Sequence, residues 1–220
     1  MTVRRRVVLA VGANLGDRLG TLLGCVEAIG RLPDTDVLAT SPVYETAPVG
    51  GPAQPDYLNA VLIAATGLGP RELLEATHCI EAEFGRVRAE RFGPRTLDID
   101  IISFAAQVSG DPVITLPHPR AHERAFVLAP WHDIDADATI PGRGPVRDLL
   151  AGLDTGGIRH RPDMILRPPE VLAPPEVLAP AEVLAPAEVP PQPEVPPQPE
   201  VPPQPEVPPQ PEAGPSAEVI

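Results

Sequence analysis

The chain has 220 residues, enough for one domain or for one domain with an appendage. Its 17 basic residues are all arginine, which excludes lysine-dependent chemistry such as Walker-type NTPase loops, Schiff bases and the kinase-strand lysine. The net charge is −13, and residues 168–220, with nine glutamates and no basic residue, account for −9 of it. Residues 1–167 therefore carry −4 and offer no broad positive field to a nucleic acid.

Two cysteines, Cys25 and Cys79, are too few for a disulfide framework and lack metal-site spacing, which favours a reducing compartment. Arginines 4–6 before a short apolar run imitate a minimal signal peptide, but the polar residues Asn14 and Asp17 follow at once. No segment approaches the roughly 18 apolar residues of a membrane span. We therefore expect a cytoplasmic protein that binds neither membranes nor nucleic acid.

The first part of the chain alternates strand and helix patterns. Residues 6–11 are mostly apolar and β-branched and end at a glycine turn, which predicts a strand. Residues 16–31 carry apolar side chains at helical spacing and predict a helix. Residues 37–44 and 57–65 alternate as strands do, and the Gly- and Pro-rich loop 47–55 between them could make them a hairpin.

Two further elements complete this pattern. A helix is predicted from Pro70, a favoured first-turn residue, to Gly85, and a strand over 97–104. The order β-α-β-β-α-β is that of ferredoxin-like folds, so the expected class is α+β, with an antiparallel sheet covered on one face by two helices. Residues 105–160, with a short helix near 146–153, are expected to form an added C-terminal subdomain that completes a domain over residues 1–160.

Residues 161–220 are expected to form a proline- and glutamate-rich tail. A glutamate recurs every six residues from Glu170 to Glu218, and 19 of the 33 prolines follow residue 167. These repeats lack the apolar mass for a packed core, so we predict a disordered tail with local polyproline II geometry. The tail could be a solvated spacer or a ligand for a proline-recognising protein, and both alternatives stay open.

The strongest chemical signal is the pair Asp98 and Asp100. Residues two apart on a strand share a face, so both carboxylates point together while Leu97, Ile99 and Ile101 face the core. Adjacent like charges favour a cation between them, and carboxylates without nearby cysteines or paired histidines favour Mg²⁺ over Zn²⁺. Taken alone, the pair could equally lie exposed on an edge strand.

Arginines crowd around this pair in the sequence. Arg86, Arg88, Arg91 and Arg95 precede it, and Arg124 follows it. Guanidinium groups make bidentate bonds to phosphate oxygens, so the grouping suits a polyanionic ligand beside a metal ion. A nucleic-acid patch is the alternative, which the net charge of residues 1–167 disfavours.

Residues 91–102, with the sequence RFGPRTLDIDII, resemble the signature of the 6-hydroxymethyl-7,8-dihydropterin pyrophosphokinases, a family of folate-biosynthesis enzymes. Residues 12–16, 44–50 and 54–60 resemble the first strand-turn, the pterin loop and the third strand of that family. Further blocks that agree lie at residues 116–119 and 124–128. The tail has no counterpart in this resemblance.

The resemblance implies transfer of a pyrophosphoryl group from ATP to the 6-hydroxymethyl oxygen of 6-hydroxymethyl-7,8-dihydropterin, with release of AMP. It also implies two Mg²⁺ ions, held by Asp98 and Asp100, that bridge the ATP phosphates. Either aspartate could accept the hydroxyl proton, or no separate base is needed, and both alternatives stay open. We expect a monomer whose partners are these two small molecules.

The resemblance further implies roles for individual side chains. Arg86 and Arg95 match a catalytic arginine loop that closes over bound substrates. The residues expected to bind the pterin are Thr46, Val49, Tyr57, Asn59 and Phe126. Those expected to bind ATP are His78, Glu81, Arg88, Phe92, Ile101, His118 and Arg124.

Three positions depart from the family pattern. Phe92 stands where tryptophan is usual, which keeps stacking but loses the indole donor. Ala47 replaces a common proline, and Pro119 stands where some relatives have a tyrosine. None of these changes removes a metal ligand. The alternatives to the enzyme are a non-catalytic pterin- or nucleotide-binding module and a scaffold that acts through the proline-rich tail.

Overall fold

The computed structural model describes residues 3–48, 53–85 and 95–167. The chain divides into two units, residues 1–174 and 175–220, and all described residues belong to the first. Among the residues described, none of the helices combines the length and the apolar composition that a membrane span requires.

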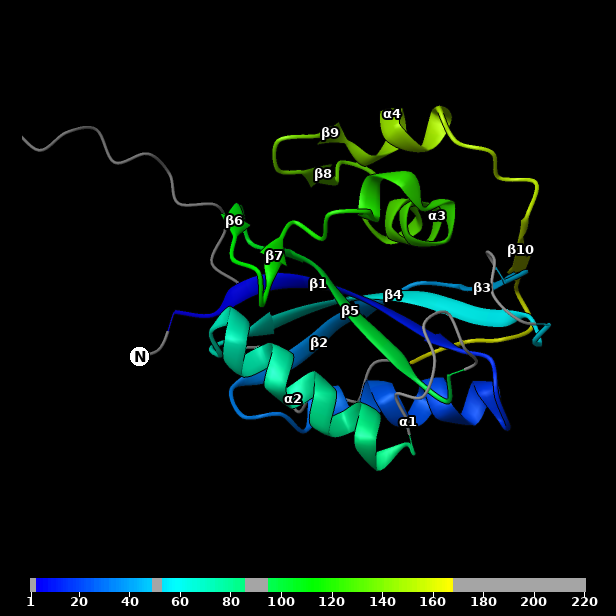
Figure 1. The fold of residues 1–220 in the computed structure, drawn as a ribbon, viewed down its shortest axis with the longest axis horizontal. Coiled ribbons are helices and arrows are strands. Elements are labelled where there is room, and N and C mark those ends of the chain that lie inside the picture. Colours follow the sequence, from blue (N-terminus) through cyan, green and yellow to red (C-terminus); the bar gives the residue numbers. More distant parts are fainter. Residues whose placement is uncertain (1–2, 49–52, 86–94, 168–220) are drawn as a thin grey trace, which may run out of the picture. The chain divides into compact units, whose positions relative to one another are not determined.

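A six-stranded antiparallel sheet forms the centre of the first unit (Figure 1). Its strands are β1 (Arg5–Ala13), β2 (Thr35–Thr40), β3 (Val43–Thr46), β4 (Tyr57–Thr66), β5 (Asp98–Phe104) and β10 (Ile158–Arg161). The strand order is β10-β3-β4-β1-β5, and β2 pairs with β4 beside β3. This order leaves β5 at one edge, next to β1, and β10 at the other edge, next to β3.

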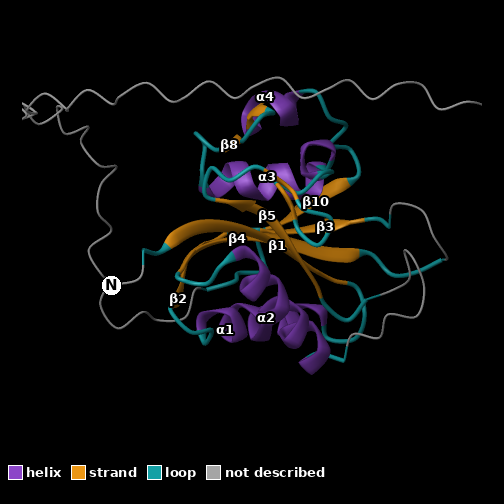
Figure 2. Cartoon of the chain, turned by 60° about the vertical axis from the view of Figure 1, so that its left-hand side comes forward, coloured by secondary structure: helices purple, strands orange, loops and turns teal. Residues whose placement is uncertain are grey.

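Helices cover both faces of the sheet (Figure 2). On one face lie α1 (Arg18–Gly30) and α2 (Pro70–Glu83), and on the other lie α3 (Ala125–Ile134) and α4 (Val146–Ala151). The short elements between β5 and α4 are β6 (Ser109–Gly110), β7 (Thr115–Leu116), a 3-10 turn (Ala121–Glu123), β8 (Thr139–Ile140) and β9 (Gly144–Pro145).

Strand β1 contains a continuous apolar run because helices lie on both faces of the sheet. Val7, Leu9 and Val11 belong to the core against α1 and α2, whereas Val8 belongs to the second core against α3. A strand that is buried on both faces carries no regular polar alternation. The prediction of a strand from the continuous apolar residues is therefore confirmed.

Most of the predicted elements are confirmed. The hairpin holds, because β3 pairs antiparallel with β4. Helix α2 begins at Pro70, and Gly85 follows its end with a φ of 75° that favours glycine. Helix α1 begins at Arg18 because the Asp17 side chain accepts a hydrogen bond from the Gly20 amide and caps it.

The single strand predicted over residues 37–44 is wrong, because β2 and β3 are separated at Ser41 and Pro42. Pro42 has no amide hydrogen to give to a sheet ladder. The Ser41 hydroxyl instead accepts a hydrogen bond from the Val61 amide, and the Ser41 amide donates to the Val61 carbonyl. Both halves therefore stay attached to β4.

The expectation that helices cover only one face of the sheet is wrong, and the residues expected to form the added subdomain, 105–160, pack against the sheet. Helix α3 lies on the second face with α4 packed against it, and β10 joins the main sheet by pairing with β3. The fold continues past the expected boundary at residue 160, since Leu166 is buried and its carbonyl accepts a hydrogen bond from the Thr40 hydroxyl. The C-terminal segment up to Arg167 is thus part of the domain.

Candidate functional site

Asp98 and Asp100 lie on the edge strand β5, on the face that α3 covers. The intervening side chains confirm the predicted alternation, because Leu97, Ile99 and Ile101 are buried in the core on the α1–α2 side. The two carboxylates are partly exposed, with side-chain exposures of 24% and 33%. They therefore project together at an accessible edge of the sheet.

Each carboxylate is paired with one of the predicted arginines. Arg95 Nη1 lies 2.5 Å from Asp98 Oδ2, and Arg124 Nη1 lies 3.0 Å from Asp100 Oδ2. Burial lowers the pKa of Arg95, but the neighbouring Asp98 more than offsets this and raises it. These pairs explain how two like charges stay adjacent on one strand.

His118 reaches the same edge from the segment that follows β7. Its amide donates to the Ile102 carbonyl at 2.9 Å, which fixes this segment beside β5. Its Nε2 atom lies 3.8 Å from Asp100 Oδ2. Burial lowers the pKa of His118, and the attraction of Asp100 only partly opposes this, so the imidazole is neutral at pH 7. A neutral imidazole can still offer one N–H donor to a ligand.

Glu81 and His78 come from α2, which packs beside β5. Glu81 is 2% exposed, and its Oε1 atom accepts a hydrogen bond from the Ile99 amide at 2.8 Å. This contact satisfies an amide on the edge strand between the two aspartates. His78 lies one helical turn before Glu81 and is exposed.

The predicted residues at the β5 edge line a single cleft. Seven of the predicted site residues line it: His78, Glu81, Arg95, Asp98, Asp100, Ile101 and His118. The remaining walls come from Leu74, Ile99 and residues 112–115 and 119. Pro119, a departure from the family pattern, thus lies in the wall of this cleft.

The predicted pterin-binding residues lie on the neighbouring strands. Asn59 and Thr46 are buried, with exposures of 8% and 6%, and Asn59 Nδ2 donates to Thr46 Oγ1 at 2.7 Å. Tyr57 is half-buried on the same face of β4 as Asn59, which confirms the expected shared face. This group is more enclosed than the pair on β5.

Phe126 and Arg124 approach from the start of α3, which crosses the same face of the sheet. The Arg124 guanidinium carbon lies 5.6 Å from the centroid of the Phe126 ring, a cation–π distance. Arg124 thereby contacts both Asp100 and Phe126. Arg124 therefore links the cleft on β5 to the predicted pterin side.

Gly12 is a site residue that the sequence reasoning missed. It pairs with Asn59 on one side and with Asp98 on the other, so it separates the two groups within the sheet. A Cβ atom at Gly12 would lie 2.8 Å from Asn59 Oδ1, closer than a real contact allows. A glycine near the end of an apolar strand was the available signal, since it marks a close approach.

Asn14 was also missed as a positioning residue. It is 1% exposed, and its Oδ1 atom accepts a hydrogen bond from the Arg95 amide at 2.8 Å. Its Nδ2 atom donates to Gln54 Oε1 at 3.0 Å and to the Pro55 carbonyl at 3.2 Å. One buried amide therefore holds the backbone before β5 and the segment before β4 together.

Four predicted site residues, Val49, Arg86, Arg88 and Phe92, lie outside the described residues, as does the repeat tail.

The carboxylate pair fits the expected Mg²⁺. The described residues contain no group of three or more His, Cys, Asp or Glu side chains that could hold a metal ion. Two carboxylates alone suit Mg²⁺, which is commonly held by one or two carboxylates, with water and substrate phosphates as its other ligands. Asp98 and Asp100 are thus the described residues that would hold it.

Comparison with known proteins identifies the family. A family model described as 7,8-dihydro-6-hydroxymethylpterin-pyrophosphokinase matches residues 8–136. A 2-amino-4-hydroxy-6-hydroxymethyldihydropteridine pyrophosphokinase of Pseudomonas aeruginosa is 40% identical over 158 residues, which cover 72% of this chain and 98% of the relative. The same-named protein of Mycobacterium tuberculosis is 43% identical over 162 residues, covering 68% of this chain and 84% of the relative.

Solved structures support the same fold. The crystal structure of wild-type HPPK-DHPS from Plasmodium falciparum matches with a TM-score of 0.52 at 13% identity. The match covers 67% of this chain, and the chain spans 44% of the length of that protein. An HPPK-DHPS crystallised in complex with substrates gives a TM-score of 0.53 at 12% identity, with 67% of this chain and 43% of that chain covered. The structural likeness shows a shared fold, and the sequence matches show that the chain belongs to the 7,8-dihydro-6-hydroxymethylpterin-pyrophosphokinase family.

Proposed function

We propose that this chain transfers the pyrophosphoryl group of ATP to the 6-hydroxymethyl group of 6-hydroxymethyl-7,8-dihydropterin, as a step of tetrahydrofolate biosynthesis. Membership of the pyrophosphokinase family supports this activity. One observation supports the roles proposed for individual residues: Gly12 on β1 pairs with Asn59 on β4 and with Asp98 on β5, so the three residues lie side by side on neighbouring strands. Two strand spacings separate its ends by roughly 10 Å.

The edge of the sheet at β5 is the proposed phosphate end. Arg95 and Arg124 supply guanidinium groups beside the two carboxylates, and their planar donors suit phosphate oxygens. Arg86 and Arg88 are proposed to add cationic charge from residues 86–94. His78, Glu81, Phe92, Ile101 and His118 are proposed to surround the nucleotide.

The ends of β3 and β4 are the proposed pterin end. The Asn59 amide can both donate to and accept from the amide edge of a pterin, and Thr46 holds it in place through one hydrogen bond. Tyr57 and Phe126 offer flat surfaces for the ring system. Val49 would contribute from the loop before β4. Because the pterin end and the phosphate end share one sheet face, a pterin bound at Asn59 can direct its hydroxymethyl group toward Asp98.

In the proposed reaction, the hydroxymethyl oxygen forms a bond to the β-phosphorus of ATP, and the bond from that phosphorus to the α–β bridging oxygen breaks. The leaving group is AMP, and the hydroxyl proton is lost either to Asp98 or Asp100 or without a separate base. Mg²⁺, when bound at Asp98 and Asp100, neutralises phosphate charge; two ions are proposed. Arg95 and Arg124 orient the phosphates and stabilise charge on the transferring group.

Nucleotide product analysis tests this function. The full chain is mixed with ATP, Mg²⁺ and 6-hydroxymethyl-7,8-dihydropterin, and AMP and ADP are quantified over time. The proposal predicts AMP in equal amount to the consumed pterin. ADP would mean ordinary phosphoryl transfer, and pterin binding without turnover would favour the non-catalytic binding module.

The remaining expectations concern the whole chain. The cytoplasmic location and the monomeric state stay predictions. The repeat tail stays either a solvated spacer or a ligand for a proline-recognising protein, and removal of residues 168–220 tests the second alternative. Turnover should survive the truncation, whereas binding to a proline-recognising partner should be lost.

A further inference from the structure

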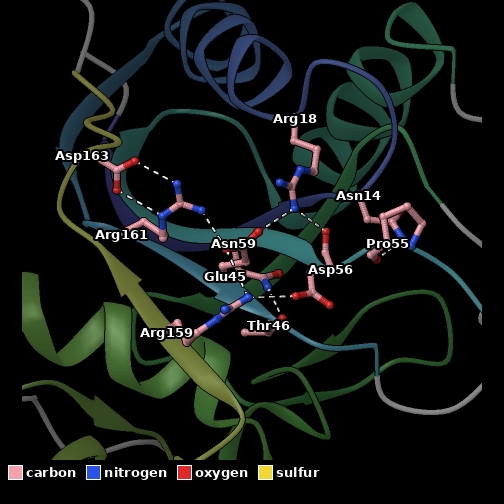
Figure 3. Close-up of polar contacts among 10 residues, drawn as sticks. All are labelled: Asn14, Arg18, Glu45, Thr46, Pro55, Asp56, Asn59, Arg159, Arg161 and Asp163. Atoms are coloured by element: carbon pink, nitrogen blue, oxygen red, sulfur yellow. Dashed lines mark hydrogen bonds and ion pairs between the residues drawn. The ribbon is translucent and has the colours of Figure 1, made fainter.

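Glu45 is a buried carboxylate that the proposed reaction does not use. It lies on β3 between Tyr44 and Thr46 and is 9% exposed. Because neighbouring strand residues alternate in direction, its side chain lies on the opposite face of the sheet from Thr46. Its two closest arginine partners come from distant parts of the chain (Figure 3): Arg18 Nη1 lies 3.0 Å from Oε1, and Arg161 Nη1 lies 2.7 Å from Oε2.

The contacts extend to the segment that enters β4. Arg18 Nη1 also donates to the Asp56 carbonyl at 2.7 Å. Arg159 Nη2 lies 3.0 Å from Asp56 Oδ2 and 3.4 Å from Glu45 Oε2. We call Glu45, Arg18, Asp56, Arg159 and Arg161 the Glu45 cluster; it joins α1, β3, the residue before β4, and β10.

The ion pairs of this cluster fix the arrangement of its segments more than they add to the free energy of unfolding. Burial would raise the pKa of Glu45, but hydrogen bonds from Arg161 and Arg18 outweigh it and lower this pKa. Glu45 is therefore ionised at neutral pH. A buried ion pair of this kind adds little net stability compared with an apolar replacement, whereas its directional bonds restrict which arrangement of the chain is allowed.

The segments that the Glu45 cluster joins carry the proposed pterin-binding residues. Glu45 immediately precedes Thr46, and Asp56 immediately precedes Tyr57. Thr46 in turn orients Asn59 through the 2.7 Å hydrogen bond. The cluster thus connects the end of β3 with the start of β4.

We propose that Glu45 is a positioning residue for pterin binding, which acts through Arg18 and Arg161 to hold Thr46 and Tyr57 in register. Strand β10 would then belong to the binding site, because it supplies Arg161 to the reverse face of β3. This inference rests on the proposed function, since it needs the pterin to bind at Thr46, Tyr57 and Asn59.

The Glu45→Gln substitution tests the proposal, because it keeps the shape of the side chain and removes the charge that binds Arg18, Arg159 and Arg161. We expect the KM for the pterin to rise about tenfold, while the KM for ATP and kcat change less than about threefold. The Glu45→Asp variant keeps the charge and should recover part of the pterin KM. The matched control is Glu27→Gln, which removes an exposed pair with Arg31 at 3.6 Å and should leave all three constants unchanged.

Stability is measured in parallel, by thermal unfolding of each full-length variant. If Glu45→Gln does not fold, Arg161→Gln carries the same test, with the same selective rise in the pterin KM. An unchanged pterin KM, or equal rises for both substrates, would overturn the positioning role while wild-type turnover stands. A wild-type chain that forms no AMP would instead overturn the proposed function itself.

Discussion

The two ends of the proposed site differ in the charge and the burial of their side chains. At the β5 end, the side chains of Asp98 and Asp100 are 24% and 33% exposed, and each is paired with an arginine. At the β3–β4 end, Thr46 and Asn59 are each less than 10% exposed and bond to each other. Partly hydrated charges can exchange partners with an incoming polyphosphate at low cost, whereas buried polar groups must already be correctly placed. The phosphate end is therefore adaptable, and the pterin end is preorganised.

The largest effect should follow a change at the phosphate end. Asp98→Asn keeps the volume of the side chain but removes the charge that would hold Mg²⁺, so we expect kcat to fall by about 10³-fold or more. AMP production measured at saturating substrates checks this. The control is Asp137→Asn, an exposed aspartate between α3 and β8, which should retain full activity. Retention of activity within tenfold by the Asp98 variant would contradict the assignment.

Loss of a preorganised amide should act on one substrate. Asn59→Ala removes hydrogen bonds worth about 2 kcal/mol, so the KM for the pterin should rise about 30-fold, with little change in the KM for ATP. Steady-state kinetics with each substrate varied in turn measures both constants. Equal rises in the KM for the pterin and the KM for ATP would show that the two ends do not bind separate substrates.

A smaller and more specific effect is expected at Gly12. Gly12→Ala would place a Cβ atom 2.8 Å from Asn59 Oδ1, so Asn59 must shift and the pterin KM should rise about tenfold. The same substitution in the Asn59→Ala background should have much less effect. Gly110→Ala, where nothing lies within 4 Å, is the matched control. An equal rise in the pterin KM in both backgrounds would show that the effect of Gly12→Ala does not act through Asn59.

The smallest expected effect is the pH dependence of stability that comes from Glu45. Its pKa in the folded chain lies below the ordinary value of 4.5, so its pairing with Arg18 and Arg161 contributes fully above pH 4.5. That contribution is lost as the pH falls through the lowered pKa. Urea unfolding between pH 7 and pH 3 should show a steeper acid decline for the wild type than for Glu45→Gln. Parallel curves would exclude the linkage.

The sequence was sufficient for the elements whose patterns are local. The alternation around Asp98 and Asp100 gave the strand and its outward face, because strand periodicity needs only neighbouring residues. The helix after Pro70 and the hairpin followed from equally local signals. The split between β2 and β3 was missed, although Pro42 marked it.

Contacts between distant segments were not predictable from these patterns. Strand β10 spans the predicted boundary between domain and tail at residue 160. The segment Ile158–Arg161 is short and mostly polar, and only pairing with β3 makes it a strand. Arg18, Glu45 and Arg161 are unremarkable in isolation, and their meeting depends on the completed sheet. The same holds for Asn14, whose three partners lie 40 or more residues away. The resemblance to the family gave the remaining site residues.

The division between an adaptable phosphate end and a preorganised pterin end is tested most directly by binding of a nucleotide alone. Isothermal titration with Mg²⁺ and α,β-methylene-ATP, which cannot be cleaved at the reacting bond, is carried out on the wild type, Asp98→Asn and Asn59→Ala. We predict at least a tenfold loss of affinity for Asp98→Asn and no change beyond twofold for Asn59→Ala. Equal weakening in both variants, or loss only in Asn59→Ala, would contradict this account.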